Sequence, residues 1–140
     1  MMTDYKIPIL KAQRIEELQS SFSKAYPFLK IEFFKNGHGR QTHSYKKDML
    51  NPQTTFQDIR KDIIDGEFII SDSLTVGQLE KQVYEQFGLP MQVFRRSGNI
   101  WLETTMTDGW TLQQQNEHGK EISASIKRPS FPEESESGVE

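Results

Sequence analysis

"TVGQLEKQVYEQFGLPMQVF", residues 75–94, places its large apolar residues at the spacing of a helix that buries one side. The intervals between these residues are three, four and four positions, and the residues are Val76, Leu79, Val83 and Phe87. This spacing predicts an amphipathic helix over residues 76–87. Thr75 and Gln78 have the pattern of a capping box at its start, and Gly88 is typical of a helix end.

A second stretch with the same rhythm, "RIEELQSSFSKAYPFLKIEFF", begins 61 positions earlier at Arg14. Its apolar residues are Ile15, Leu18, Phe22 and Tyr26. They predict a helix over residues 14–26, which Pro27 would end. In both stretches alternating apolar residues follow and predict a strand. The alternation differs by one position between the two copies, because at an offset of 61 Ile31 aligns with Gln92.

The remaining segments fit the same repeated unit. Glycine-containing turns, "NGHG" and "SGN", follow the two strands, and "RQTHSYKK" and "IWLETTM" are predicted as return strands. The spacing in "TTFQDIRKDIIDG" predicts a short helix, and "GWTLQQQNEHG" is a weaker candidate for another. Strands are also expected before the two long helices, at residues 5–10 and 67–71.

These elements predict a single α+β domain over residues 1–126. We expect a two-layer sandwich, with the two main helices on one face of a largely antiparallel sheet and with pseudo-repeated β-α-β-β units, because one unit alone offers too little surface to cover its apolar faces. The predicted core is Ile15, Leu18, Phe22, Tyr26, Ile31, Phe33, Phe68, Ile70, Val76, Leu79, Val83, Phe87, Met91 and Val93. Residues 127–140, rich in Pro, Ser and Glu, predict an acidic, disordered tail.

This order of elements is similar in outline to the ferredoxin-like fold, in which two βαβ halves pack as a two-layer sandwich. The resemblance covers about residues 5–105 and concerns topology alone. Residues 87–112 also resemble small bacterial proteins. Because unrelated activities share such folds, neither likeness implies a function.

Composition excludes several classes of site. The 140 residues contain no cysteine, which excludes disulfides, thiolate zinc sites, iron–sulfur clusters and a cysteine nucleophile. The N-terminal stretch does not resemble a secretory signal and no apolar run approaches a membrane span, so we expect a soluble, cytoplasmic protein without a membrane partner. The net charge is −3, but four glutamates lie in the tail, and without them 17 basic residues face 16 acidic ones. This balance differs from that of a dedicated nucleic-acid binder.

The most distinctive candidate site is "KNGHGRQTHSYKK", residues 35–47, which contains no acidic residue. Its candidate ligand-binding residues are Lys35, His38, Arg40, His43, Lys46 and Lys47. The glycines would let the backbone approach a phosphate, and Arg40 could bind it with two hydrogen bonds. The alternative is a solvated hairpin whose glycines only form the turn. His38 and His43 have no carboxylate near them in the segment, so no metal and no cofactor are expected.

Arginine and tryptophan residues flank the second turn. Arg95 and Arg96 precede it and are further candidates for ligand binding, although on a strand they would point to opposite faces. Trp101 is expected to lie in the core or to cover the sheet, rather than to stack on a nucleic-acid base. Trp110 lies in a polar setting, where it either covers the edge of the core or anchors a protein interface.

The sequence contains no phosphate-binding loop, dinucleotide fingerprint, nucleophile elbow or zinc-protease motif, so no catalytic residue is predicted. The leading hypothesis is a non-catalytic binding or interaction module, with a protein partner or with self-association through an exposed sheet edge. The first alternative is a nucleic-acid or phosphate-ligand binder that uses residues 35–47 with Arg95 and Arg96. The second alternative is an enzyme of unrecognised type.

Overall fold

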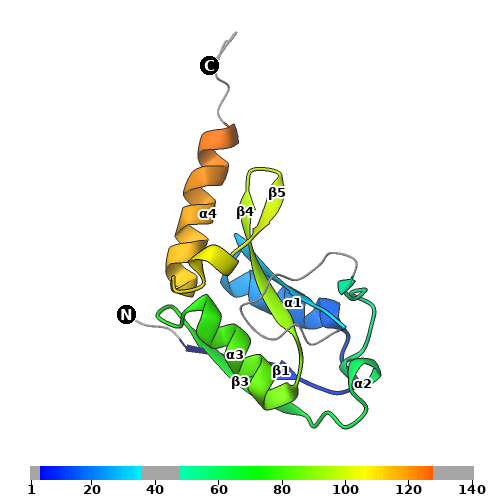
Figure 1. The fold of residues 1–140 in the computed structure, drawn as a ribbon. Helices are drawn as coiled ribbons and strands as arrows, with labels where there is room; N and C mark the ends of the chain where they lie inside the picture. The colour runs from blue at the N-terminus through cyan, green and yellow to red at the C-terminus, as the bar shows by residue number, and fades with distance from the viewer. Residues whose placement is uncertain (1–3, 36–47, 128–140) are drawn as a thin grey trace.

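The computed structural model describes residues 4–35 and 48–127, which form helices and strands in alternation (Figure 1). The elements are β1 (Asp4–Ile9), α1 (Ile15–Ala25), β2 (Leu29–Phe33), α2 (Phe56–Ile59), β3 (Gly66–Ser71), α3 (Val76–Phe87), β4 (Met91–Ser97), β5 (Ile100–Glu103), the 3-10 helix η2 (Thr105–Thr107) and α4 (Leu112–Lys127). The order repeats: a strand, a long helix, a second strand, and later a further helix. None of the helices in this described part is long and apolar enough to cross a membrane.

The predicted α+β fold with antiparallel strands is confirmed. The strands form two antiparallel sheets, one with the order β1-β3 and one with the order β2-β4-β5. Each sheet therefore contains a strand from each half of the chain. Helix α4 lies alongside the β4–β5 hairpin, which projects from the rest of the molecule (Figure 1).

Strand register shows that the repeat is a feature of the fold. Ile7 lies opposite Phe68 in the β1–β3 pair, 61 positions apart, and Ile31 lies opposite Val93 in the β2–β4 pair, 62 positions apart. The extra position arises in the helices, because α3 has 12 residues and α1 has 11. Each sheet therefore contains a pair of opposite residues that occupy corresponding positions in the two units. This is the pairing expected when two units are related by an approximate twofold axis.

The starts of the helices are joined in pairs. Arg14 and Thr55, which precede α1 and α2, form an isolated antiparallel bridge, and Thr75 and Thr111, which precede α3 and α4, form another. The surrounding backbone hydrogen bonds correspond in the two units: Ile15 N–H donates to Thr54 O (2.9 Å) and Val76 N–H to Trp110 O (3.0 Å), while Phe56 N–H donates to Gln13 O (3.1 Å) and Leu112 N–H to Leu74 O (2.8 Å). These contacts confirm that the strand, helix and strand of one unit recur in the other. The return strand predicted for the first unit, "RQTHSYKK", lies outside the described residues. The capping box of Thr75 and Gln78 is confirmed as well.

The core is continuous across the two units. All the residues predicted for it are buried, and Leu18 and Leu79, from the two helix stripes, are both 0% exposed. The ring of Phe56, on α2, meets that of Phe33 edge-on at 5.3 Å between centroids. Burial of these apolar side chains supplies the main driving force for the fold.

Two helices differ in length from the prediction. Helix α2 spans only four residues, and α4 spans 16, well beyond the weak signal in "GWTLQQQNEHG". The face of α4 that lies on the sheet contains polar residues, since Gln115 and Ser123 are buried beside Leu112. An apolar periodicity could not reveal a helix whose buried face is held by hydrogen bonds.

Candidate functional site

The acid-free segment predicted as a ligand-binding hairpin lies mostly outside the described residues. His38, Arg40, His43, Lys46 and Lys47 belong to that part. Lys35 is described and exposed, and its N–H donates to Asp48 O at 3.1 Å. Phe34 forms an antiparallel bridge with Met49 just beyond. The described residues on either side, Lys35 and Asp48, are therefore joined beside the end of β2.

Arg95 and Arg96 lie on opposite faces of the β2-β4-β5 sheet, as expected for neighbours on a strand. Arg95 faces α4, where its Nη1 donates to Gln115 Oε1 at 2.7 Å and its guanidinium lies 5.9 Å from the Trp110 ring. Burial lowers the pKa of Arg95 from its ordinary value. The structure thus brings together two of the candidate residues, Arg95 and Trp110, in the contact between sheet and helix.

Gln115 and His118 complete this contact. Gln115 is fully buried, and its Nε2 also donates to the backbone and the hydroxyl of Thr107 at 2.7 and 2.9 Å. The His118 ring packs edge-on against Trp110, with 5.4 Å between centroids. The cluster holds α4 on the hairpin, with Gln115 buried, Arg95 and His118 half-buried and Trp110 37% exposed.

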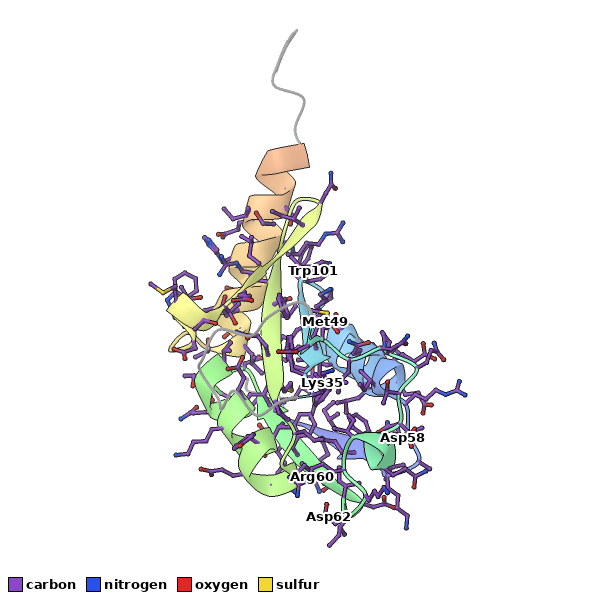
Figure 2. The ribbon with its side chains drawn as sticks, turned by 45° about the vertical axis from the view of Figure 1, so that its right-hand side comes forward. Lys35, Met49, Asp58, Arg60, Asp62 and Trp101 are labelled. Carbon is purple, nitrogen blue, oxygen red and sulfur yellow. The ribbon has the colours of Figure 1, made fainter. Side chains whose placement is uncertain are left out.

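The other face of this sheet carries a groove of about 430 Å³, which we call the outer-face groove. Its apolar lining is Phe34, Met49, Phe94, Ile100 and Trp101, and its charged lining is Lys30 and Glu103. Figure 2 shows Trp101, Met49 and Lys35 on the same side of the molecule. Arg96 points to this side too, since it lies opposite Trp101 in the strand register, and its Nε donates to Gly98 O at 2.8 Å.

Lys30 is the central charge of the outer-face groove. Its Nζ lies 5.1 Å from the centroid of the Trp101 ring and 5.7 Å from that of Phe94, within the range of cation–π contacts. It also forms an ion pair with Glu32 at 3.1 Å. Sequence reasoning did not predict this group, because the contact of Lys30 with Phe94 depends on the register of β2 and β4.

Glu80 is the carboxyl with the most unusual surroundings. It is 2% exposed, and burial raises its pKa to about 8, with Asp108 and Glu103 adding to the rise. Its Oε2 accepts the N–H of Val93 at 3.0 Å. Although a carboxyl with this pKa suits acid–base chemistry, a side chain so enclosed and so engaged with the backbone serves the fold.

A smaller hollow of about 310 Å³ lies at the far end of α3, beside the ion pair of Arg60 and Asp62 (Figure 2). Arg60 lowers the pKa of Asp62, which is fully exposed in this arrangement. Exposed ion pairs contribute little stability and are common on surfaces. Within the described part of the chain, no group of three or more His, Asp or Glu side chains is placed to hold a metal ion.

No known protein family model matches the sequence, and neither the curated proteins nor the solved structures include a significant match.

Proposed function

We propose that the protein is a non-catalytic binding module whose ligand is held in the outer-face groove. The observation that supports this proposal is the apolar lining of the groove, with Trp101, Phe94 and Met49 around the ammonium group of Lys30. Aromatic and methionine side chains are enriched where proteins bind other proteins, because they offer large contact areas that adapt to a partner.

The charges around the groove favour an acidic partner. Lys30 lies in the groove, Lys35 is exposed beside it, and Arg96 points to the same face of the sheet. Glu32 and Glu103 offset part of this charge. We therefore propose as ligand a polypeptide segment that presents an aromatic or aliphatic anchor next to acidic residues, the anchor entering the groove and a carboxylate facing Lys30. A cytoplasmic location is part of the proposal, in line with a sequence without cysteine.

Selection from a library of displayed random peptides tests this ligand class without assuming a sequence. The expected result is enrichment of peptides that combine an aromatic residue with acidic neighbours. The Trp101→Ala and Lys30→Glu proteins should lose binding of the enriched peptides, by tenfold or more, since a buried aromatic anchor commonly contributes about 2 kcal/mol or more. Met106→Ala is the matched control, because Met106 is 95% exposed. Enriched peptides without acidic residues, or binding unchanged in Trp101→Ala, would contradict the proposal.

Single-stranded nucleic acid is the second candidate ligand. It is favoured by the position of Lys30 and Arg96 on the same sheet face as Trp101, since cations beside an aromatic ring suit backbone binding and base stacking. Arg95, on the opposite face, would take no part. A labelled oligonucleotide should then bind with an affinity that falls steeply with salt, and Arg96→Ala should weaken it. An enzymatic role receives no support from Glu80, which is enclosed.

A further inference from the structure

The outer edge of β3 is closed by side chains of α3. Gln82 bonds to both backbone groups of Ile69, accepting its N–H and donating to its carbonyl, each at 3.3 Å. Gln86 donates to the carbonyl of Glu67 at 2.9 Å. These backbone groups consequently point away from β1. Closing an edge in this way prevents another strand from pairing with it.

The register then shows which groups of β1 point outward. Ile69 lies opposite Lys6, and Glu67 lies opposite Pro8. In an antiparallel pair, opposite residues either bond to each other or both point away. The N–H and carbonyl of Lys6 therefore point away from β3, as do the carbonyl of Pro8 and the groups of Asp4, two positions from Lys6. Within the described residues, no hydrogen bond is found to these outward groups.

Helix α1 does not cover the outward backbone groups of β1 in the way that α3 covers those of β3. The positions 61 residues before Gln82 and Gln86 hold Ser21 and Ala25. The hydroxyl of Ser21 donates to Glu17 O within its own helix at 3.2 Å, and alanine has no polar side-chain atom. A groove of about 380 Å³ lies here between β1 and α1. One unit of the repeat thus has a closed edge, and the other has an open edge with space beside it.

We propose that the open edge of β1 pairs antiparallel with β1 of a second copy of the chain, so that the two β1–β3 sheets join into one sheet. A sheet of only two strands is marginal, and additional strands stabilise it. The register places Asp4 of each copy opposite Lys6 of the other, and both residues have outward backbone groups, so each such pair exchanges its two backbone hydrogen bonds. The twofold axis passes beside Tyr5, which is 38% exposed and meets its equivalent across the axis.

Charge and backbone chemistry select this register. Oppositely charged side chains face each other twice in it, which stabilises an antiparallel pair. A shift of two residues, which moves the twofold axis from Tyr5 to Lys6, would place Lys6 opposite Lys6 of the second copy, and Asp4 opposite Pro8, which lacks an N–H. Lys6 also lies 3.9 Å from Glu67 in its own sheet, but this pair is exposed and leaves Lys6 able to contact the second copy.

The dimer is independent of the outer-face groove, since β1 takes no part in the lining of that groove. The test of peptide binding at the groove and the test of association through β1 are therefore independent, and a negative result in one does not contradict the other.

Sedimentation equilibrium of the full chain over about 1 to 300 μM tests the association, because this range detects even weak edge pairing. The chain is expected to form dimers reversibly. Asp4→Lys and Lys6→Asp each place like charges opposite each other and should raise the dimer dissociation constant about tenfold. The double variant Asp4→Lys/Lys6→Asp restores opposite charges in the proposed register and should restore dimerisation.

A proline variant tests the backbone. Lys6→Pro removes an outward N–H that β3 does not use, as Pro8 already does two positions on, and should prevent dimerisation. Lys6→Thr, which also loses the charge but keeps the N–H, is the matched control and should dimerise at least tenfold more tightly. Circular dichroism confirms that each variant is folded. A monomer throughout the range, or a double variant that dimerises no better than the single ones, would overturn the proposal.

Discussion

The carboxyl group of Glu80 accepts a hydrogen bond from the N–H of Val93, while the hydroxyl of Thr104 donates to the carbonyl of the same residue at 2.9 Å. Strand β5 pairs with β4 only from Phe94 onward, so Val93 lies just beyond the end of that ladder. The two side chains therefore supply the hydrogen bonds that a longer β5 would supply. A buried backbone group without a partner would cost about 1–3 kcal/mol, which accounts for a carboxyl in so dry a place.

Glu80 should make stability depend on pH. The folded state raises its pKa from 4.5 to about 8, so folded protein holds the proton more tightly than unfolded protein. The free energy of unfolding should fall as pH rises from 4.5 towards 8, by at most about 1.4 kcal/mol per pH unit, and should level off above 8. Glu80→Gln stays neutral and can still accept the N–H of Val93, so its stability should change less with pH.

Denaturant titrations of both proteins at several pH values between 5 and 9 measure this difference. At pH 8.5 the Glu80→Gln protein should be more stable than the wild type by about 1 kcal/mol or more. Glu117→Gln, at an exposed position, is the control and should retain the wild-type slope. Equal slopes for wild type and Glu80→Gln would contradict the assignment.

The two helix stripes should contribute equally to stability. Leu18 and Leu79 occupy corresponding positions of the repeat and are both 0% exposed, so Leu18→Ala and Leu79→Ala should each lower the free energy of unfolding by about 2–5 kcal/mol. Ile64→Ala, at a position 79% exposed, should change it by less than about 0.5 kcal/mol. A small effect at one leucine only would show that the units do not share one core.

Local patterns in the sequence were sufficient for much of this fold. The helix stripes, the capping box at Thr75 and the buried apolar positions of β2 and β3 follow from spacing, because these properties depend on neighbouring residues. Strand pairing could not be predicted in the same way. Because α3 has one residue more than α1, aligning the two stretches at an offset of 61 placed Ile31 beside Gln92. The alternation of the two strands therefore appeared not to match, and only the strand register showed that Ile31 pairs with Val93.

The glutamines on α3 should protect the protein from strand association at the β3 edge. Replacing both Gln82 and Gln86 by alanine removes the hydrogen bonds to Ile69 and Glu67, at a cost of about 0.5–1.5 kcal/mol per bond. The double replacement also leaves the outward backbone groups of β3 without these partners, so that the β3 edge becomes open in addition to the β1 edge. Light scattering should then show assemblies larger than those of the wild type. Gln113→Ala, at an exposed position of α4, is the control.

Gly88 should be sensitive to any side chain. Its φ is +69°, which costs an L-residue about 1–2 kcal/mol, and an added Cβ would overlap the guanidinium of Arg60. Gly88→Ala should therefore destabilise the protein by about 1–2 kcal/mol in thermal or denaturant unfolding. Gly109→Ala is the control, because nothing lies within 4 Å of the Cβ position there. Equal destabilisation by Gly88→Ala and Gly109→Ala would contradict the requirement for glycine at residue 88.

The candidate site was harder to predict than the fold. Clusters of like charge in the sequence directed attention to residues 35–47, Arg95 and Arg96, but Arg95 turns towards α4 and Arg96 to the opposite face. The outer-face groove depends on Lys30 reaching the rings of Phe94 and Trp101, which come from two other strands. Such contacts between distant segments leave no periodicity in the sequence.

Both sheets contain strands from both halves of the chain, and this has a consequence for folding. A cut after Lys61, between α2 and β3, would leave β1 without β3 and β2 without β4. Each fragment alone should lack most of its structure, because its apolar strand faces would have no partner. Mixed together, the fragments should reassemble into the native fold, and circular dichroism would follow this complementation. Each fragment would then serve as the template on which the other folds.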